Sequence, residues 1–223
     1  MNTVADQLTR QQLRQQFFEK MMDSPHRNIT KRISVEVFPA YRVIRLEGRN
    51  SERLHDFEIA LINTYSREIA YYVDVAYVDA DFGGKPPIHA LAYRSTDAAH
   101  KVALDGFAAS VLFDCLVPDH TVILTDGNPT DGGPFLWESR ISLAINYGRK
   151  AYFIQPDGVL RRLSSRDDHI ALNDEIWSTP NAGKINLAAI SGKELTAIAD
   201  HDFLLNHLKP RMATKVTDLV SKV

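Results

Sequence analysis

Alternating and periodic apolar positions divide the chain into short predicted elements. In residues 32–38 and 41–48 apolar and polar side chains alternate, which predicts two strands of an antiparallel hairpin with one buried face. Apolar residues at helical spacings predict a helix over residues 52–69, with Ser51 as its N-cap. The first 23 residues carry apolar side chains near one stripe, among glutamines and arginines, which predicts an amphipathic helix.

The same patterns predict the elements of the remaining chain. Apolar and β-branched runs predict strands at residues 71–79, 88–94, 121–125, 151–154 and 185–190. Helical spacing predicts helices at residues 98–117, 137–147 and 193–208. The sequence Pro156-Asp157-Gly158 between two extended runs predicts a hairpin turn.

Strands and helices follow one another in an order that predicts an α/β fold, with a mixed, largely antiparallel sheet flanked by helices. We expect a single α/β domain over residues 1–223. In this interpretation residues 1–25 form the N-terminal amphipathic helix, residues 30–163 form the core, and residues 164–223 form a C-terminal extension.

Composition narrows the possible roles. The 223 residues, 44% of them hydrophobic, suffice for one sizeable core, and the net charge of -2 gives no global attraction to nucleic acid or anionic membranes. No apolar run has the length of a membrane-spanning helix and the N-terminus lacks the pattern of a secretory signal, so we expect a cytoplasmic protein without membrane contact. The single cysteine, Cys115, lies in an apolar run, which favours a buried, inert thiol.

The first candidate site is the predicted helix 98–117, which follows a strand and a polar loop. Gly106, Phe107 and Ala108 are expected near the start of a helical turn, where exposed backbone N–H groups can hold a pyrophosphate. The alternative role of Gly106 is to allow close contact between helix and sheet.

The order of elements in residues 70–163 resembles the core of the GNAT superfamily of N-acetyltransferases, which bind acetyl-CoA. The resemblance rests on "IHALAYR", a helix with "DGFAAS", "TVILTD", "FLWESRISLAINYG" and "AYFIQ". In that family an Arg/Gln-x-x-Gly-x-Gly/Ala signature holds the CoA pyrophosphate through backbone amides. Gly106 and Ala108 match its last two positions, whereas Ala103 stands where arginine or glutamine is usual.

The resemblance also implies roles in catalysis. The CoA pyrophosphate would lie against Ala103 to Ala108, and a strand amide near Tyr93 would stabilise the oxyanion. Ala144 occupies the place of the family's usual tyrosine acid, so Tyr147, next to Gly148, is the candidate substitute.

Two further polar segments are alternative candidate sites. Asp126 and Asp131 follow a strand and Glu138 lies in the next helix, a pattern that resembles the nucleoside 2-deoxyribosyltransferases, in which a glutamate is the nucleophile. The alternative is that this loop serves only as a turn. Asp79 and Asp81 fall on one side of an extended strand and resemble the Asp-x-Asp element of metal-dependent glycosyltransferases, against the simpler interpretation of a solvent-facing strand end.

No metal site is predicted from these patterns. Three histidines, His89, His100 and His120, can act as bases where they face a cleft, because histidine exchanges protons near neutral pH.

The leading hypothesis is an acyl-CoA-dependent N-acyltransferase that uses acetyl-CoA and transfers the acetyl group to an amine of a small molecule or protein. Asp126 and Asp79 are candidate bases that remove the amine proton. Two alternatives stay open: a nucleoside or nucleotide glycosyl-transfer enzyme that uses Glu138, and a protein-interaction domain without chemistry.

Overall fold

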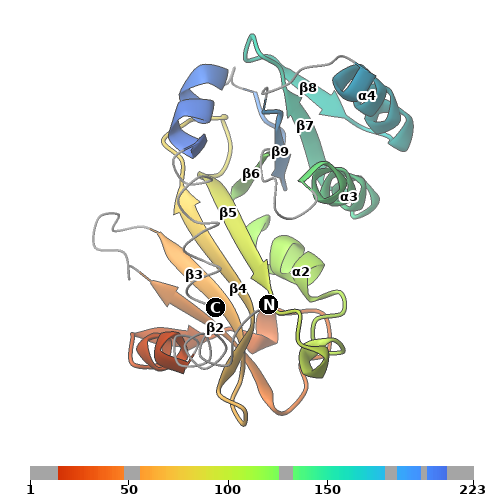
Figure 1. Cartoon of the computed structure of the whole chain (residues 1–223). Helices are drawn as coiled ribbons and strands as arrows, with labels where there is room; N and C mark the ends of the chain where they lie inside the picture. Colours follow the sequence, from red (N-terminus) through yellow and green to blue (C-terminus); the bar gives the residue numbers. More distant parts are fainter. Residues whose placement is uncertain (1–14, 48–55, 126–132, 179–184, 197–199, 210–223) are drawn as a thin grey trace, which may run out of the picture. The chain divides into compact units, whose positions relative to one another are not determined.

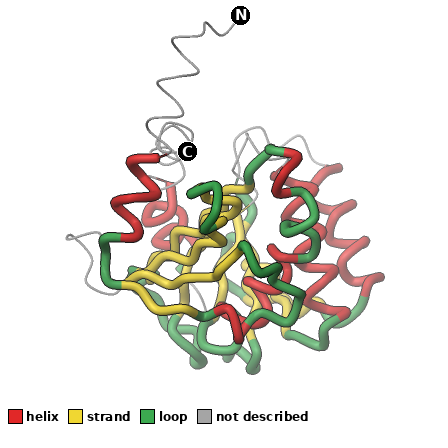
Figure 2. Tube along the Cα trace, turned by 90° about the horizontal axis from the view of Figure 1, so that it is seen from below, coloured by secondary structure: helices red, strands yellow, loops and turns green. Residues whose placement is uncertain are grey.

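The structure is a computed structural model that describes residues 15–47, 56–125, 133–178, 185–196 and 200–209. Within them it has an α/β fold (Figure 1). The strands are β1 His26–Asn28, β2 Tyr41–Glu47, β3 Phe57–Asn63, β4 Glu68–Tyr77, β5 Pro87–Arg94, β6 Thr121–Thr125, β7 Lys150–Ile154, β8 Leu160–Leu163 and β9 Leu187–Ser191. The helices are η1 Thr30–Arg32, η2 Ala98–His100, α2 Phe107–Ser110, the π-helix η3 Val111–Leu116, α3 Gly133–Asn146 and α4 Arg166–Ser178; residues 15–22 and 201–209 are also helical (Figure 2).

The nine strands form one mixed sheet in the order β1-β2-β3-β4-β5-β6-β9-β7-β8. The β5–β6 pair is parallel, with His89 opposite Ile123, whereas β9 pairs antiparallel with both β6 and β7. The expectation of a mixed, largely antiparallel sheet with helices is therefore confirmed.

The chain divides into two compact units. Unit 1 comprises residues 1–76, 90–111 and 213–223, and unit 2 comprises residues 77–89 and 112–212. The single-domain organisation stays a prediction. No helix in the described part of the chain is both long and apolar enough to cross a membrane.

The apolar cluster of unit 1 joins the helical residues 15–22 to one face of the sheet. Phe18 and Met21 are buried against side chains of β2, β3 and β4. These buried partners are Ile44, Leu46, Ala60, Ile62, Ile69 and Tyr72. Residues 15–22 thus bury one side of a helix, while residues 1–14 of the predicted amphipathic helix lie outside the described residues.

Unit 2 has its own apolar cluster. It contains Val78, Phe82, Ile123, Tyr152, Ile154, Leu187, Ala189, Leu195, Leu204 and Leu208. The predicted hairpin is confirmed in this unit, since β7 and β8 pair antiparallel around Gly158, which has a φ of 83°. The Gln155 amide closes the turn by donating to the Val159 carbonyl at 3.0 Å.

The predicted helix over residues 52–69 is wrong, because β3 and the start of β4 occupy the described part of this range. All residues from Phe57 to Ile62 are buried. A strand buried on both faces has no polar alternation, and its apolar residues then match a helical spacing by coincidence. Residues 48–55 lie outside the described residues, together with the proposed N-cap Ser51.

The predicted strand over residues 32–38 is also wrong. Residues 34–38 have no strand structure, and β2 pairs with β1 and β3 instead. This segment contacts a residue distant in sequence: the Val35 amide donates to Ser110 Oγ at 3.3 Å, and Ser34 Oγ lies 2.7 Å from the same oxygen. The Val35 amide is therefore bonded to a side chain and not to a neighbouring strand.

The C-terminal part differs from its prediction in two places. Helix α4 was not predicted, and the predicted helix over residues 193–208 begins too early, because residues 193–196 are not helical. The helical residues 201–209 follow Asp200, whose Oδ1 accepts the Phe203 amide at 2.8 Å as an N-cap does.

Candidate functional site

The predicted helix 98–117 is interrupted, and the interruption lies at its candidate pyrophosphate site. Gly106 has a φ of 65° and directly precedes the four-residue helix α2. A Cβ at this position would lie 3.3 Å from Val35 Cγ1. The left-handed conformation and the close neighbour both favour glycine, so the backbone geometry explains why residue 106 is a glycine.

The residues around Gly106 divide into buried and exposed ones. Ala103 and Phe107 are buried, and the Phe107 ring meets Tyr71 edge to face with 5.3 Å between centroids. The Phe107 amide donates to the Leu104 carbonyl at 3.4 Å. Gly106 and Ala108 are exposed. Of the four candidate cofactor residues in this segment, these two therefore present their surface to solvent.

Tyr93 lies on β5 and is half-buried, with its side chain packed against the apolar cluster of unit 1. Its ring thus contributes to packing.

The Asp79–Asp81 pair lies beyond the end of β4 at Tyr77, so the two carboxylates are not on one side of a strand as expected. Asp79 is exposed. Asp81 Oδ1 accepts the Gly83 amide at 2.7 Å, which is an Asx-turn contact. The turn interpretation accounts for Asp81.

The remaining predicted residues that the structure describes, Glu138 and Tyr147, belong to unit 2. Asp126 and Asp131 are outside the described residues. Tyr147 is 60% exposed, and its ring stacks on Phe113 with 4.8 Å between centroids. Glu138 is half-buried and acts electrostatically on His169 of α4.

His169 is a neighbour of Glu138 that the sequence did not reveal. It is buried, and its Nδ1 lies 2.9 Å from Ser142 Oγ. Burial lowers the pKa of His169 below its usual value, and the Glu138 carboxylate opposes this shift in part. The imidazole is therefore held in its neutral form.

A second polar cluster of unit 2 surrounds Glu194. Its carboxylate accepts a short hydrogen bond from the Tyr152 hydroxyl and forms ion pairs with Lys150 at 3.1 Å and Arg162 at 2.8 Å. The bond from Tyr152 is the largest cause of the lowered pKa of Glu194. Burial, followed by the bond to Glu194, raises the pKa of Tyr152. The Tyr152 oxygen also accepts the Leu195 amide at 3.2 Å, so the cluster fastens the segment after β9 to β7.

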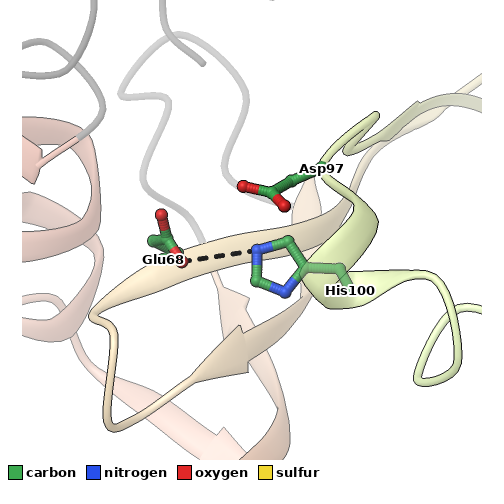
Figure 3. A group of neighbouring side chains, drawn as sticks. All are labelled: Glu68, Asp97 and His100. Atoms are coloured by element: carbon green, nitrogen blue, oxygen red, sulfur yellow. Dashed lines mark ion pairs between the residues drawn. The ribbon is translucent and has the colours of Figure 1, made fainter.

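The cluster with metal-ligand chemistry consists of Glu68, Asp97 and His100, all in unit 1 (Figure 3). Glu68 begins β4, while Asp97 and His100 come from the turn η2 after β5. One ligand atom from each residue lies within 4.8 Å of the other two. His100 Nε2 is 3.5 Å from Glu68 Oε2.

Tyr41 holds the imidazole of this cluster from the opposite side. Its hydroxyl lies 2.9 Å from His100 Nδ1. The sheet register explains the position, because Tyr41 pairs with Asn63 on β3, and Asn63 pairs with Glu68 on β4.

The positions of His89 and His120 are also defined. Both are buried. His120 Nε2 lies 3.0 Å from the Tyr77 hydroxyl, and its Nδ1 lies 3.2 Å from the Leu116 carbonyl. His120 is thus held by two polar partners inside unit 2, as a structural histidine is.

The comparisons with known proteins leave the family open: no family model, curated protein or solved structure matches the chain.

Proposed function

We propose that the chain is an acyl-CoA-dependent N-acyltransferase of GNAT-like fold, which transfers an acetyl group from acetyl-CoA to an amine. The observation that carries the proposal is the parallel pair β5–β6 with a helical connection between its strands. The order β5, α2, β6, α3, β7 is the succession on which the resemblance to the GNAT superfamily rests. Ligands of α/β folds bind beyond the carboxyl ends of such parallel strands.

The exposed atoms of the β5–α2 connection support a phosphate site. Gly106 has no side chain and Ala108 only a methyl group, so a pyrophosphate can approach the backbone, and both residues are exposed. Arg94 at the end of β5 and Lys101 in the connection are exposed cations. Ala103 and Phe107 act by packing, since both are buried beneath this surface.

The proposed reaction is direct transfer. The amine nitrogen attacks the thioester carbonyl, the new C–N bond forms as the C–S bond breaks, and CoA leaves as a thiolate that is then protonated. A backbone N–H of β5 near Tyr93 donates to the oxyanion. The amine proton passes to a base, for which Asp79 and Asp126 are the candidates, and Tyr147 is the candidate acid that the resemblance implies.

A thermal-shift titration with acetyl-CoA and CoA tests the cofactor. A ligand that binds only the folded chain stabilises it by about 2.7 kcal/mol at a hundredfold excess over Kd. We expect a rise in Tm for the natural chain and a loss of that rise in Ala108→Glu, because an anion there repels the pyrophosphate. Ala108 is the better position for this test than Gly106, where the φ of 65° strains any replacement.

Ile170→Glu is the matched control, because Ile170 is an exposed helical residue of α4 and receives the same charge. Its response to acetyl-CoA should equal that of the natural chain. Absence of any shift with millimolar acetyl-CoA or CoA would refute the proposed cofactor. If Ala108→Glu and the natural chain bind acetyl-CoA with equal affinity, the pyrophosphate does not bind at this segment.

A further inference from the structure

We propose that Glu68, Asp97 and His100 bind one divalent cation of the zinc class. The three residues supply one imidazole nitrogen and two carboxylate oxygens within 4.8 Å of one another. In Figure 3 the side chains of Glu68 and Asp97 lie on the side of His100 that carries its ion pair to Glu68. The site is independent of the CoA chemistry proposed above.

His100 is the fixed member of the site. Its side chain is 2% exposed, and the Tyr41 ring meets it edge to face at 5.9 Å. With a proton on Nδ1, the imidazole donates to the Tyr41 oxygen 2.9 Å away, and Nε2 presents its lone pair toward Glu68. The Tyr41 hydroxyl then points its own hydrogen to the Ala99 carbonyl at 3.5 Å. A hydrogen bond on the other ring nitrogen is how proteins orient a metal-binding histidine.

The two carboxylates are the adjustable members. Asp97 Oδ1 accepts the Ala99 amide at 2.8 Å, which anchors the side chain and leaves Oδ2 for a metal. The Glu68 side chain is 45% exposed. Bonds of about 2.0–2.1 Å in a tetrahedron require ligand atoms about 3.3 Å apart. The exposed side chains can close the present separation by small rotations, while the buried histidine keeps its place.

The donor set selects the kind of cation. An imidazole nitrogen with carboxylates suits Zn²⁺ and related transition metals, whereas Mg²⁺ and Ca²⁺ prefer oxygen ligands alone. Three protein ligands leave one tetrahedral position for water, as in zinc sites that are open to a ligand. The sequence signal is "DAAH", in which Asp97 and His100 are three residues apart across one turn.

Isothermal titration calorimetry with ZnCl₂ tests the site. The sample is the metal-free full chain without a histidine tag. We expect one zinc per chain from the natural protein and no binding of MgCl₂. Glu68→Gln and Asp97→Asn should each weaken zinc binding by at least about tenfold. Asn at position 97 can still accept the Ala99 amide, so Asp97→Asn removes the ligand charge and keeps the cap.

Tyr41→Phe distinguishes a metal site from a simple histidine–glutamate ion pair. It keeps all three ligands and removes only the oxygen that orients His100, so we expect a loss of zinc affinity of about 10- to 100-fold. Asp23→Asn is the control, because Asp23 is an exposed acid of the same unit outside the cluster; its zinc affinity should not change. Absence of zinc binding by the natural chain, or unchanged binding in both Glu68→Gln and Asp97→Asn, would overturn the proposal.

Discussion

Ser165 and Asp168 cap the start of α4 reciprocally. The Asp168 amide donates to Ser165 Oγ at 3.1 Å, and Asp168 Oδ2 accepts the Ser165 amide at 3.0 Å and the Ser164 amide at 2.9 Å. Backbone N–H groups that the helix leaves without partners are satisfied in this way.

We expect Ser165→Ala to lower the free energy of unfolding by about 1 kcal/mol, the usual cost of losing an N-cap side chain. Urea denaturation at neutral pH measures the change. Ser164→Ala is the matched control, because the described contact of Ser164 with the cap uses its backbone amide. Equal stability of the Ser165→Ala variant and the natural chain would show that the cap contributes nothing.

Asp168 makes the stability contributed by this cap depend on pH. Its hydrogen bonds to the Ser164 amide and the Ser165 side chain lower its pKa below the ordinary value of 3.8. A carboxyl with a lowered pKa in the folded state stabilises the fold above pH 3.8, and this contribution is lost as the pH falls through the lower folded value. We therefore expect Asp168→Asn to flatten the acid limb of stability against pH. An acid limb identical to that of the natural chain would contradict this role.

His169 gives a second pH dependence with a different window. Its pKa is lowered from 6.5 by burial, so the unfolded chain binds the proton first as the pH falls. The free energy of unfolding should drop below about pH 6.5, and His169→Gln should remove this part of the drop. Urea titrations at pH 7.5 and 5 measure the difference between the two chains.

Glu138→Gln separates the two causes of that shift. The Glu138 carboxylate raises the pKa of His169, so its removal should lower this pKa further and increase the loss of stability in acid. A smaller loss in Glu138→Gln would contradict the assigned sign. The histidine ring signals in an NMR titration report the pKa of His169 directly.

Tyr152 joins two parts of unit 2 through one oxygen. Tyr152→Phe removes the donor to Glu194 and leaves the Leu195 amide without this acceptor, which we expect to cost about 1–3 kcal/mol. The raised pKa of Tyr152 also predicts that stability falls as the pH rises above about 10, because the unfolded chain loses the proton first. Denaturation series at pH 8 and pH 10.5 check both points, and the alkaline fall should be smaller in the variant.

Gly83 and Gly148 form a matched pair for backbone strain. Their φ values are 70° and 66°, so alanine at either position should cost about 1–2 kcal/mol. A Cβ at Gly83 would also collide with Thr196 Oγ1, whereas a Cβ at Gly148 has no atom within 4 Å. Thermal denaturation should therefore show a larger loss for Gly83→Ala than for Gly148→Ala. The reverse order would contradict the close approach of Thr196.

The sequence predicted elements well where pattern and turn chemistry agree. The strand at β6 and the hairpin around Gly158 are both marked by residues that act locally. Helix α4 also has a local signal in its sequence, the capping pair Ser165 and Asp168. In contrast, β3 is buried on both faces by contacts distant in sequence, and its pattern alone does not distinguish strand from helix.

The candidate sites also differ in whether local sequence or contacts distant in sequence determine them. Gly106 belongs to a short motif that drew attention to it, but the pattern predicts a helical residue there, whereas its φ of 65° interrupts the helix. The Glu68–His100 contact depends on sheet register, which brings Tyr41 and Glu68 to the same end of the sheet through Asn63. No spacing along the chain predicts this contact, although "DAAH" contains two of the three residues of the cluster.

The place of β9 between β6 and β7 has a consequence for biosynthesis. Both neighbours leave the ribosome before their common partner has been made, so each exposes a hydrogen-bonding edge on the nascent chain. Pairing between distant segments is slow, and unpaired edges favour aggregation. Unit 2 can complete its sheet only once Ser191 has emerged. Translation pauses before that point expose an unfinished sheet to chaperones and proteases.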